Sequence, residues 1–369
     1  MPPLRLGIVG CGSLTERGLL PHLRLEPASV TVTALCDVSQ TRLEHVADRF
    51  GIKGRFTDYS ELLAQAEIDA VAIATPIQLH YEQAQEALTA GRHVYVQKTM
   101  AGTGEEARHL MRLAEERELT LAASPGQMGL PAYARARDVV DEGRLGKPLM
   151  AIGITLARGH EYEAVRSGGD LDPSWYYSEG AGPLRDMGVY ALHAIAGILG
   201  PVQAVTALGT RPSETRRWGG SQLPTEVNEG VVITLDLSGG ALGAVIAGYT
   251  MAPGYLDWGH LAISGTEGAL EVRRPSGSPS RYEVILQTVE LGTPTHESYG
   301  TGLGRGHDAL EEAHVARDLL DFVEAVRGSR PPLAHPADAC HVIDIIEAAE
   351  AAVTKAERRS VPPPPPRPG

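Results

Sequence analysis

Lysine is scarce in this chain, and long apolar runs are missing from it. Of 33 basic residues only four are lysines, Lys53, Lys98, Lys147 and Lys355. A lysine kept in a chain that otherwise uses arginine is a candidate for a role that needs an amine. No run of about 18 apolar residues occurs, so no transmembrane helix is predicted and no membrane is expected as a partner.

Cysteine is also rare, and the patterns of metal sites are missing. Cys11, Cys36 and Cys340 are odd in number and widely spaced, which fits a reducing compartment rather than a disulfide framework. No C-x-x-C or H-E-x-x-H occurs, so spacing suggests no metal. Residues 1–5 lack the layout of a secretory signal, and we expect a cytoplasmic protein. The net charge of −13 argues against nucleic acid, which is bound through basic residues.

Two domains and a tail are predicted from the 369 residues. Within 1–124, apolar strand-like segments alternate with helical ones, which predicts a doubly wound parallel sheet. Within 125–358, a helix over 131–141 is followed mostly by strands separated by short turns. This order predicts an α/β domain on a large, open, mainly antiparallel sheet. Residues 359–369 are rich in proline, and we expect a disordered polyproline II segment.

Two predicted strands of the second domain, 231–237 and 241–247, are apolar at alternate positions on both sides. One covered face is enough for an antiparallel sheet, and the other can face water. Strands as apolar as these are not expected to leave a face in solvent. We therefore expect a homodimer or homotetramer built through this sheet.

A glycine-rich turn, Gly10-Cys11-Gly12-Ser13-Leu14-Thr15, follows the first predicted strand and opens a helix, the context of a dinucleotide-binding turn. Gly10 permits the tight turn, and Gly12 lets the backbone approach a pyrophosphate at the helix N-terminus. Thr15 replaces the third glycine of G-x-G-x-x-G. Asp37, 22 residues after Thr15, is placed to bind the adenosine ribose and would repel a 2′-phosphate, so NAD is favoured over NADP.

Lys98 follows the predicted strand 93–96, at the sheet edge where ligands of open parallel sheets bind. A partly desolvated lysine there would lower the pKa of a neighbouring acid or polarise a substrate oxygen. The alternative is an ordinary surface lysine.

Asp186, Tyr190 and His193 stand at i, i+4 and i+7 of a predicted helix, and share an arc of about 60°. Apolar residues occupy the other side of this helix. A carboxylate, a phenol and an imidazole can each move a proton, so the stripe is a candidate catalytic face. The alternative is a solvated face.

Loops 159–163 and 172–177 flank that helix and carry His160 and Trp175. Ring faces stack on the C–H surfaces of a polyol and polar groups bind its hydroxyls, so both residues are candidate substrate contacts. Ordinary loop packing is the alternative.

Taken together, these motifs resemble the Gfo/Idh/MocA oxidoreductases, the family of glucose–fructose oxidoreductase and inositol dehydrogenase. The resemblance covers nearly the whole chain. It rests on the glycine turn, on 69–76 ending in His80, on 91–98 and on 186–190. It implies a Rossmann domain followed by an α/β substrate domain, and oxidation or reduction of sugars and polyols with NAD or NADP.

Site residues carried over from the resemblance fall into three sets. The implied catalytic residues are Lys98, Asp186, Tyr190 and His193, with Tyr190 the first choice for the acid/base and His193 the second. Cofactor binding is implied for Gly10, Cys11, Gly12, Ser13, Leu14, Asp37, Ala74, Thr75, Pro76, His80, Gln97 and Lys98. Substrate binding is implied for Lys98, His160, Trp175, Asp186, Tyr190 and His193. Lys98 would lower the pKa of the Tyr190 phenol.

One motif departs from the family: Gln97-Lys98-Thr99 stands where the family has E-K-P. Gln97 can still hydrogen-bond a nicotinamide ribose, but without the charge.

The function expected from these motifs is hydride transfer between NAD and a hydroxyl or keto group of a sugar, glycoside or polyol. One alternative is a sugar-modifying lyase or glycosidase that oxidises its substrate transiently and releases no NADH. Another is a non-catalytic regulator that binds NAD or a sugar.

Overall fold

The computed structural model describes residues 2–161, 171–250, 259–275, 280–290 and 292–367. The chain forms two compact units: 1–126 with 303–339, and 127–302 with 340–369. This division differs from the expected boundary at 124/125, after which the chain was to form one continuous second domain.

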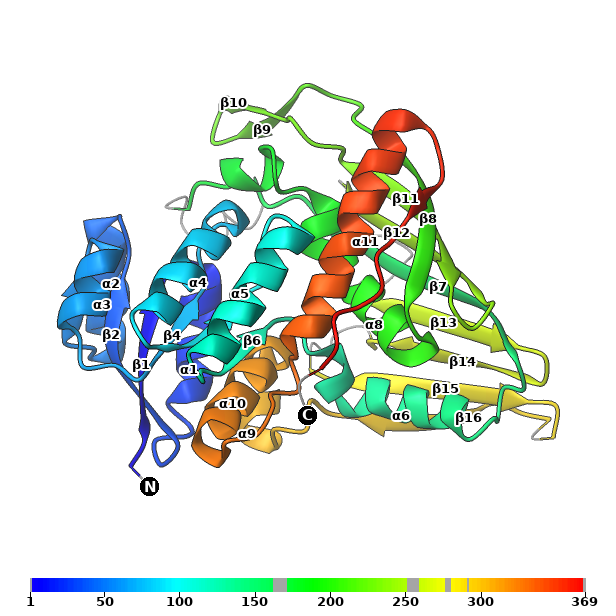
Figure 1. The fold of residues 1–369 in the computed structure, drawn as a ribbon, viewed down its shortest axis with the longest axis horizontal. Coiled ribbons are helices and arrows are strands. Elements are labelled where there is room, and N and C mark those ends of the chain that lie inside the picture. The colour runs from blue at the N-terminus through cyan, green and yellow to red at the C-terminus, as the bar shows by residue number, and fades with distance from the viewer. Residues whose placement is uncertain (1, 162–170, 251–258, 276–279, 291, 368–369) are drawn as a thin grey trace. The chain divides into compact units, whose positions relative to one another are not determined.

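The first unit contains a six-stranded parallel sheet, ordered β3-β2-β1-β4-β5-β6 (Figure 1). The expected doubly wound sheet is thus confirmed. Its strands are β1 (Leu4–Val9), β2 (Val30–Cys36), β3 (Gly54–Phe56), β4 (Ala70–Ile73), β5 (His93–Val96) and β6 (Leu121–Ala123). Its helical segments are η1 (Leu14–Leu19), α1 (Leu20–Leu23), α2 (Gln40–Phe50), α3 (Tyr59–Gln65), η2 (Ile77–Leu79), α4 (His80–Thr89), α5 (Gly104–Glu116), α9 (Arg305–Asp308) and α10 (Ala313–Gly328).

Helix α10 explains why 303–339 joins the first unit. Its apolar stripe, which includes Leu319 and Phe322, belongs to the same buried core as Leu6 of β1 and Tyr95 of β5. The rings of Tyr95 and Phe322 lie 6.0 Å apart between centroids. Apolar helix periodicity predicts that a stripe is buried but does not say against which sheet, so this assignment needed the tertiary structure.

The second unit contains a nine-stranded sheet, ordered β16-β15-β14-β13-β7-β12-β11-β8-β17. All of its pairings are antiparallel except that of β7 with β12, as expected for a mainly antiparallel sheet. Its strands are β7 (Pro148–Arg158), β8 (Val202–Thr210), β11 (Gly230–Leu237), β12 (Leu242–Thr250), β13 (His260–Gly265), β14 (Gly268–Arg273), β15 (Tyr282–Thr288), β16 (Thr295–Tyr299) and β17 (Arg359–Ser360). A separate hairpin joins β9 (Thr215–Trp218) to β10 (Ser221–Pro224).

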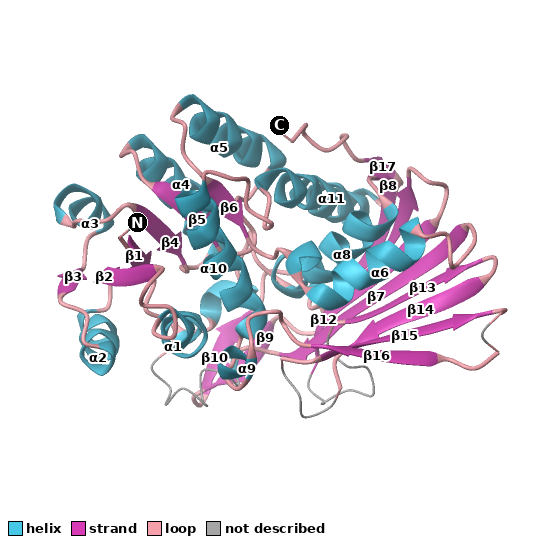
Figure 2. Cartoon of the chain, turned by 90° about the horizontal axis from the view of Figure 1, so that it is seen from below, coloured by secondary structure: helices cyan, strands magenta, loops and turns pink. Residues whose placement is uncertain are grey.

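Helices cover one face of the large sheet (Figure 2). α6 (Pro131–Asp141), α8 (Val189–Leu199) and α11 (Pro336–Lys355) share one apolar core with the strands. Short helical segments η3 (Gln127–Gly129), η4 (Ser174–Tyr177) and η5 (Leu184–Gly188) complete the unit. In the described part of the chain, no helix has the length and apolarity that crossing a membrane requires.

The chain end differs from the expected disordered tail over 359–369. β17 pairs with β8, and the Val361 N–H donates to the Gln203 carbonyl at 2.8 Å. Val361 is 7% exposed and belongs to the core of the second unit. Proline-rich composition masked this short strand, which satisfies backbone groups at the edge of β8.

Candidate functional site

The glycine turn connects β1 to η1, as the sequence predicts. Gly10 has φ +94°, and a Cβ there would lie 2.4 Å from the Ala74 carbonyl oxygen, so only glycine fits. At Gly12, by contrast, nothing lies within 4 Å of where a Cβ would be, so its backbone is open to close approach. The Thr15 hydroxyl donates to the Gly10 carbonyl at 2.6 Å, so the residue that replaces the third glycine closes the turn.

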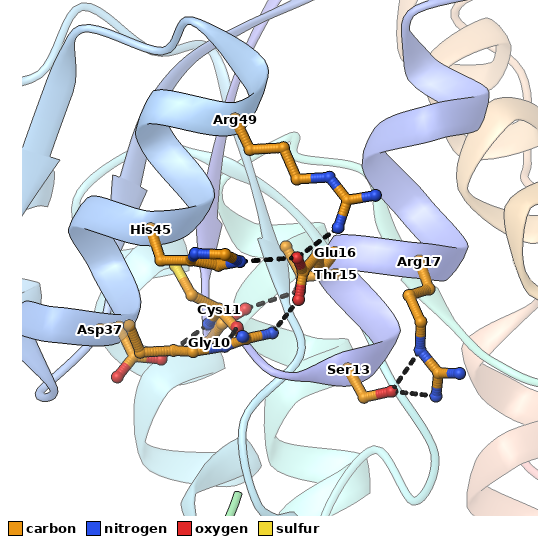
Figure 3. Close-up of polar contacts among 10 residues, drawn as sticks. Gly10, Cys11, Ser13, Thr15, Glu16, Arg17, Asp37, His45 and Arg49 are labelled. Carbon is orange, nitrogen blue, oxygen red and sulfur yellow. Dashed lines mark hydrogen bonds and ion pairs between the residues drawn. The ribbon is translucent and has the colours of Figure 1, made fainter. Parts of the chain in front are cut away.

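Asp37 lies directly after β2, beside this turn (Figure 3). Its Oδ2 accepts the Cys11 N–H at 2.7 Å, and its Oδ1 accepts the Ser39 N–H at 2.8 Å. A carboxylate has about four lone-pair sites, so Asp37 retains acceptors for ribose hydroxyls. An open backbone at Gly12, a helix start at Ser13 and Leu14 and a fixed carboxylate fit the pyrophosphate and adenosine ribose of NAD.

His80 connects the loops that follow β4 and β5. Its Nδ1 lies 2.7 Å from the Thr99 carbonyl oxygen, and its Nε2 lies 2.9 Å from that of Thr75. The ring is 1% exposed, and burial lowers the pKa of His80. Sequence reasoning made His80 a cofactor contact, whereas these bonds use both ring nitrogens within the protein. Its position next to Ala74-Thr75-Pro76 makes it a positioning residue for that loop.

Gln97 turns into the protein. Its Nε2 donates to the Tyr95 hydroxyl at 2.7 Å, and the residue is 4% exposed. The Lys98–Thr99 peptide bond that follows is cis, and Lys98 itself is half-buried. The amide expected to bind a nicotinamide ribose thus also anchors the segment that carries Lys98.

Below Tyr95 lies a buried carboxyl that the sequence did not reveal. Asp318 of α10 is 5% exposed, and its Oδ2 accepts from the Ser124 hydroxyl at 3.0 Å and from the Gly126 N–H at 2.9 Å. Burial raises the pKa of Asp318 to about 7, although both hydrogen bonds oppose that shift. No motif marks an acid on an apolar helix as buried, since its partners come from residues far away in the chain.

In the second unit, Asp186, Tyr190 and His193 are buried, at 1%, 5% and 7% exposure. The alternative of a solvated face is therefore wrong for this helix. The three do not lie on one regular α-helix either. Asp186 belongs to the π-helical turn η5, and α8 begins at Val189, so the arc calculated at 100° per residue does not apply between Asp186 and Tyr190.

Asp186 is held by two side chains from outside its own helix. Its Oδ2 contacts His160 Nε2 at 2.7 Å and accepts the Tyr249 hydroxyl at 3.1 Å. Tyr249 was missed, because the last residue of an apolar strand carries no sequence signal of a polar role. Burial, with the Asp186 charge beside it, raises the pKa of Tyr249, so its phenol remains a donor.

His160 also belongs to an aromatic stack. Its ring lies 3.4 Å from that of Tyr176 at an interplanar angle of 6°, and Trp175 stacks on the other ring partner at 3.6 Å. His160 and Trp175, predicted from separate loops, are thus brought together with Asp186. Of the first loop, residues 162 and 163 lie outside the described residues.

A second buried network supports this loop. Arg216 donates to Glu161 at 2.9 Å and to Glu229 at 2.8 Å, and Tyr177 donates to Glu161. The His160 N–H in turn donates to the Tyr177 hydroxyl at 2.9 Å. Two carboxylates around one guanidinium are compatible with burial because each charge has a partner. Within the described ranges, no three His, Cys, Asp or Glu side chains are grouped as a metal would need.

Comparison with known proteins identifies the family. Residues 4–124 match the model of an oxidoreductase family with an NAD-binding Rossmann fold, GFO_IDH_MocA, and residues 133–271 match the C-terminal domain of the same family. The chain belongs to the Gfo/Idh/MocA oxidoreductase family. The expected resemblance, the Rossmann fold and NAD as cofactor are thereby confirmed.

Two curated relatives of the family are similar over most of their length. A dTDP-3,4-didehydro-2,6-dideoxy-alpha-D-glucose 3-reductase of Streptomyces violaceoruber is 28% identical over 88% of this chain and 94% of its own. Levoglucosan dehydrogenase of Pseudarthrobacter phenanthrenivorans is 26% identical, over 88% and 90%. A solved structure of levoglucosan dehydrogenase with NADH has a TM-score of 0.82 at 22% identity, covering 98% of this chain and all of the other, which shows the shared fold.

Proposed function

We propose that this oxidoreductase transfers hydride between NAD and a hydroxyl or keto carbon of a sugar, glycoside or polyol. The observation that carries the proposal is the buried Asp186, held by His160 and Tyr249 and four residues before Tyr190. Relatives of similar length are a sugar reductase and a sugar dehydrogenase, which supports a carbohydrate substrate.

In the proposed reaction, NAD supplies the hydride acceptor, and the chain binds, orients and moves the proton. The glycine turn and Asp37 hold the adenosine half. Tyr190 takes the hydroxyl proton in oxidation and returns it in reduction, with Lys98 favouring the phenolate by its charge. Asp186 accepts a substrate hydroxyl, while His193 contributes to substrate binding or takes Tyr190's role.

The aromatic stack suits the substrate face of such a site. Trp175, Tyr176 and His160 present ring surfaces of the kind that sugar C–H groups pack against, and Asp186 beside them provides an acceptor. This combination of apolar faces and one fixed carboxylate supports a polyhydroxylated substrate over an apolar alcohol.

A panel of sugars, glycosides and polyols tests the proposal, with NAD and NADP in parallel and NADH absorbance and product analysis as readouts. Steady formation of NADH with a keto product supports it. Product formation without net NADH would indicate the lyase or glycosidase alternative. Nucleotide binding without turnover across the panel would indicate a regulator.

We also propose a homodimer or homotetramer in the cytoplasm. On the sheet face away from α6 and α8, Met150, Leu208, Val232 and Leu242 are between 46% and 76% exposed. Val232 pairs with Leu208, and Leu242 with Met150, so the apolar residues are neighbours across strands. A face of this kind supports a covering partner, and a second copy is the simplest one. The three cysteines are free and buried, which supports a reducing compartment.

A further inference from the structure

Glu16 is a buried acid of η1 that lies among three basic side chains of α2 (Figure 3). It is 7% exposed. Its Oε1 contacts Arg49 at 2.5 Å and His45 Nε2 at 3.0 Å, while its Oε2 accepts from Arg42. The α2 face nearest the glycine turn thus carries two guanidinium groups and an imidazole, and Glu16 pairs with all of them.

The carboxylate of Glu16 is ionised throughout the physiological range. Burial by itself disfavours the charge, but hydrogen bonds from Arg49 and Arg42 outweigh it and lower the pKa of Glu16 to about 2. The charge of Glu16 therefore always offsets part of the positive charge on α2.

This cluster adjoins the carboxylate expected to bind ribose. Cys11 of the glycine turn donates its N–H to Asp37 Oδ2 at 2.7 Å, and its carbonyl accepts from Arg42 Nε at 2.7 Å. One residue is thus bonded both to the carboxylate that would repel a 2′-phosphate and to a guanidinium that would attract one. Arginine binds phosphate well through its planar fork of donors, so the orientation of Arg42 matters for the choice of nucleotide.

We propose that Glu16 is a specificity-determining residue for the cofactor. By engaging Arg42 and Arg49, it keeps both guanidinium groups from serving a 2′-phosphate beside Asp37. Discrimination against NADP then has two parts, repulsion by Asp37 and sequestration of the cations by Glu16. The proposal rests on nucleotide binding at the glycine turn and not on the sugar chemistry proposed above.

Calorimetric titration of the full chain with NAD⁺ and NADP⁺, without any sugar, tests this. For Glu16→Gln, which keeps the shape and removes the charge, we expect NADP⁺ affinity to rise about tenfold relative to NAD⁺ affinity, the gain of one charge-assisted contact. The gain is expected to shrink as salt is raised. Arg42→Gln in the same background is expected to abolish it.

Glu44→Gln is the matched control, because Glu44 is an exposed acid on the same helix, hydrogen-bonded to Gln40 at 2.6 Å. It removes the same charge, and we expect no change in the ratio of the two affinities. An equal change in that ratio for Glu44→Gln and Glu16→Gln would overturn the proposal, since general charge would then explain it.

A smaller substitution, Glu16→Ser, separates specificity from folding of the turn. If both Glu16 variants lose NAD⁺ affinity by more than about threefold with no gain for NADP⁺, Glu16 acts only on the turn and the proposal is wrong. Because no sugar is present, the titration is independent of whether the chain oxidises sugars. Failure of the sugar panel and failure of this test are therefore separate results.

Discussion

Replacing the buried acid Asp318 by asparagine tests the electrostatics of the first unit. Its pKa of about 7 lies about three pH units above the ordinary 3.8, and each unit corresponds to about 1.4 kcal/mol. The pKa is higher in the folded than in the unfolded chain, so the unfolded chain loses this proton first as pH rises. The stability contributed by the neutral form is therefore complete below about pH 4 and lost progressively up to about pH 7.

Between pH 5 and pH 8, the wild type is expected to lose about 2.5 kcal/mol of unfolding free energy through Asp318 alone. Asp318→Asn has no proton to lose, so its unfolding free energy lacks this loss. The amide keeps a carbonyl oxygen that accepts from Ser124 and Gly126, which preserves the two hydrogen bonds seen in the structure. The difference between the two proteins isolates Asp318 from the other titrating groups.

Urea unfolding followed by circular dichroism measures the effect at both pH values. The three tryptophans all fall between residues 127 and 302, so their fluorescence reports on the second unit and provides an internal control. Asp48→Asn is the matched variant, because Asp48 is 71% exposed at its side chain and pairs with Arg55 on the surface. A wild-type minus Asp318→Asn difference that is the same at pH 5 and pH 8 would refute the reasoning.

Three further predictions concern the proposed site and the assembly. Tyr190→Phe and Lys98→Met are each expected to lower kcat by about 10²–10⁴ while NAD binding persists, and the double variant to be little worse than the worse single one, as single-turnover rates would show. If Tyr190→Phe is nearly normal and His193→Ala inactive, the two roles are reversed. Asp37→Ser is expected to narrow a preference for NAD of at least about tenfold, and equal wild-type affinities for NAD and NADP in a titration would contradict that assignment. Light scattering is expected to show a dimer or tetramer that Leu242→Arg weakens, whereas a concentration-independent wild-type monomer near 39 kDa would exclude it.

Much of the first unit was predictable, because its elements are defined by local patterns. Alternating apolar strands and helices indicated the parallel sheet, and the glycine turn indicated its own function before any coordinates. The geometry at Gly10 shows why: a Cβ there would collide with the Ala74 carbonyl, so the requirement for glycine is local and visible in the residue type. Asp37 was found in the same way, from its spacing to that turn and its place after a strand.

Other features depended on contacts between distant segments and left no mark in the sequence. The apolar stripe of α10 is equally suited to either core, and only packing beside β1 and β5 assigns it to the first unit. Asp186 was recognisable as a motif residue, but its partner Tyr249 lies 63 positions away and reads as an ordinary strand residue. Periodicity records which side of an element is buried, whereas the identity of the group that meets it is decided by long-range packing and by the need of each buried charge for a partner.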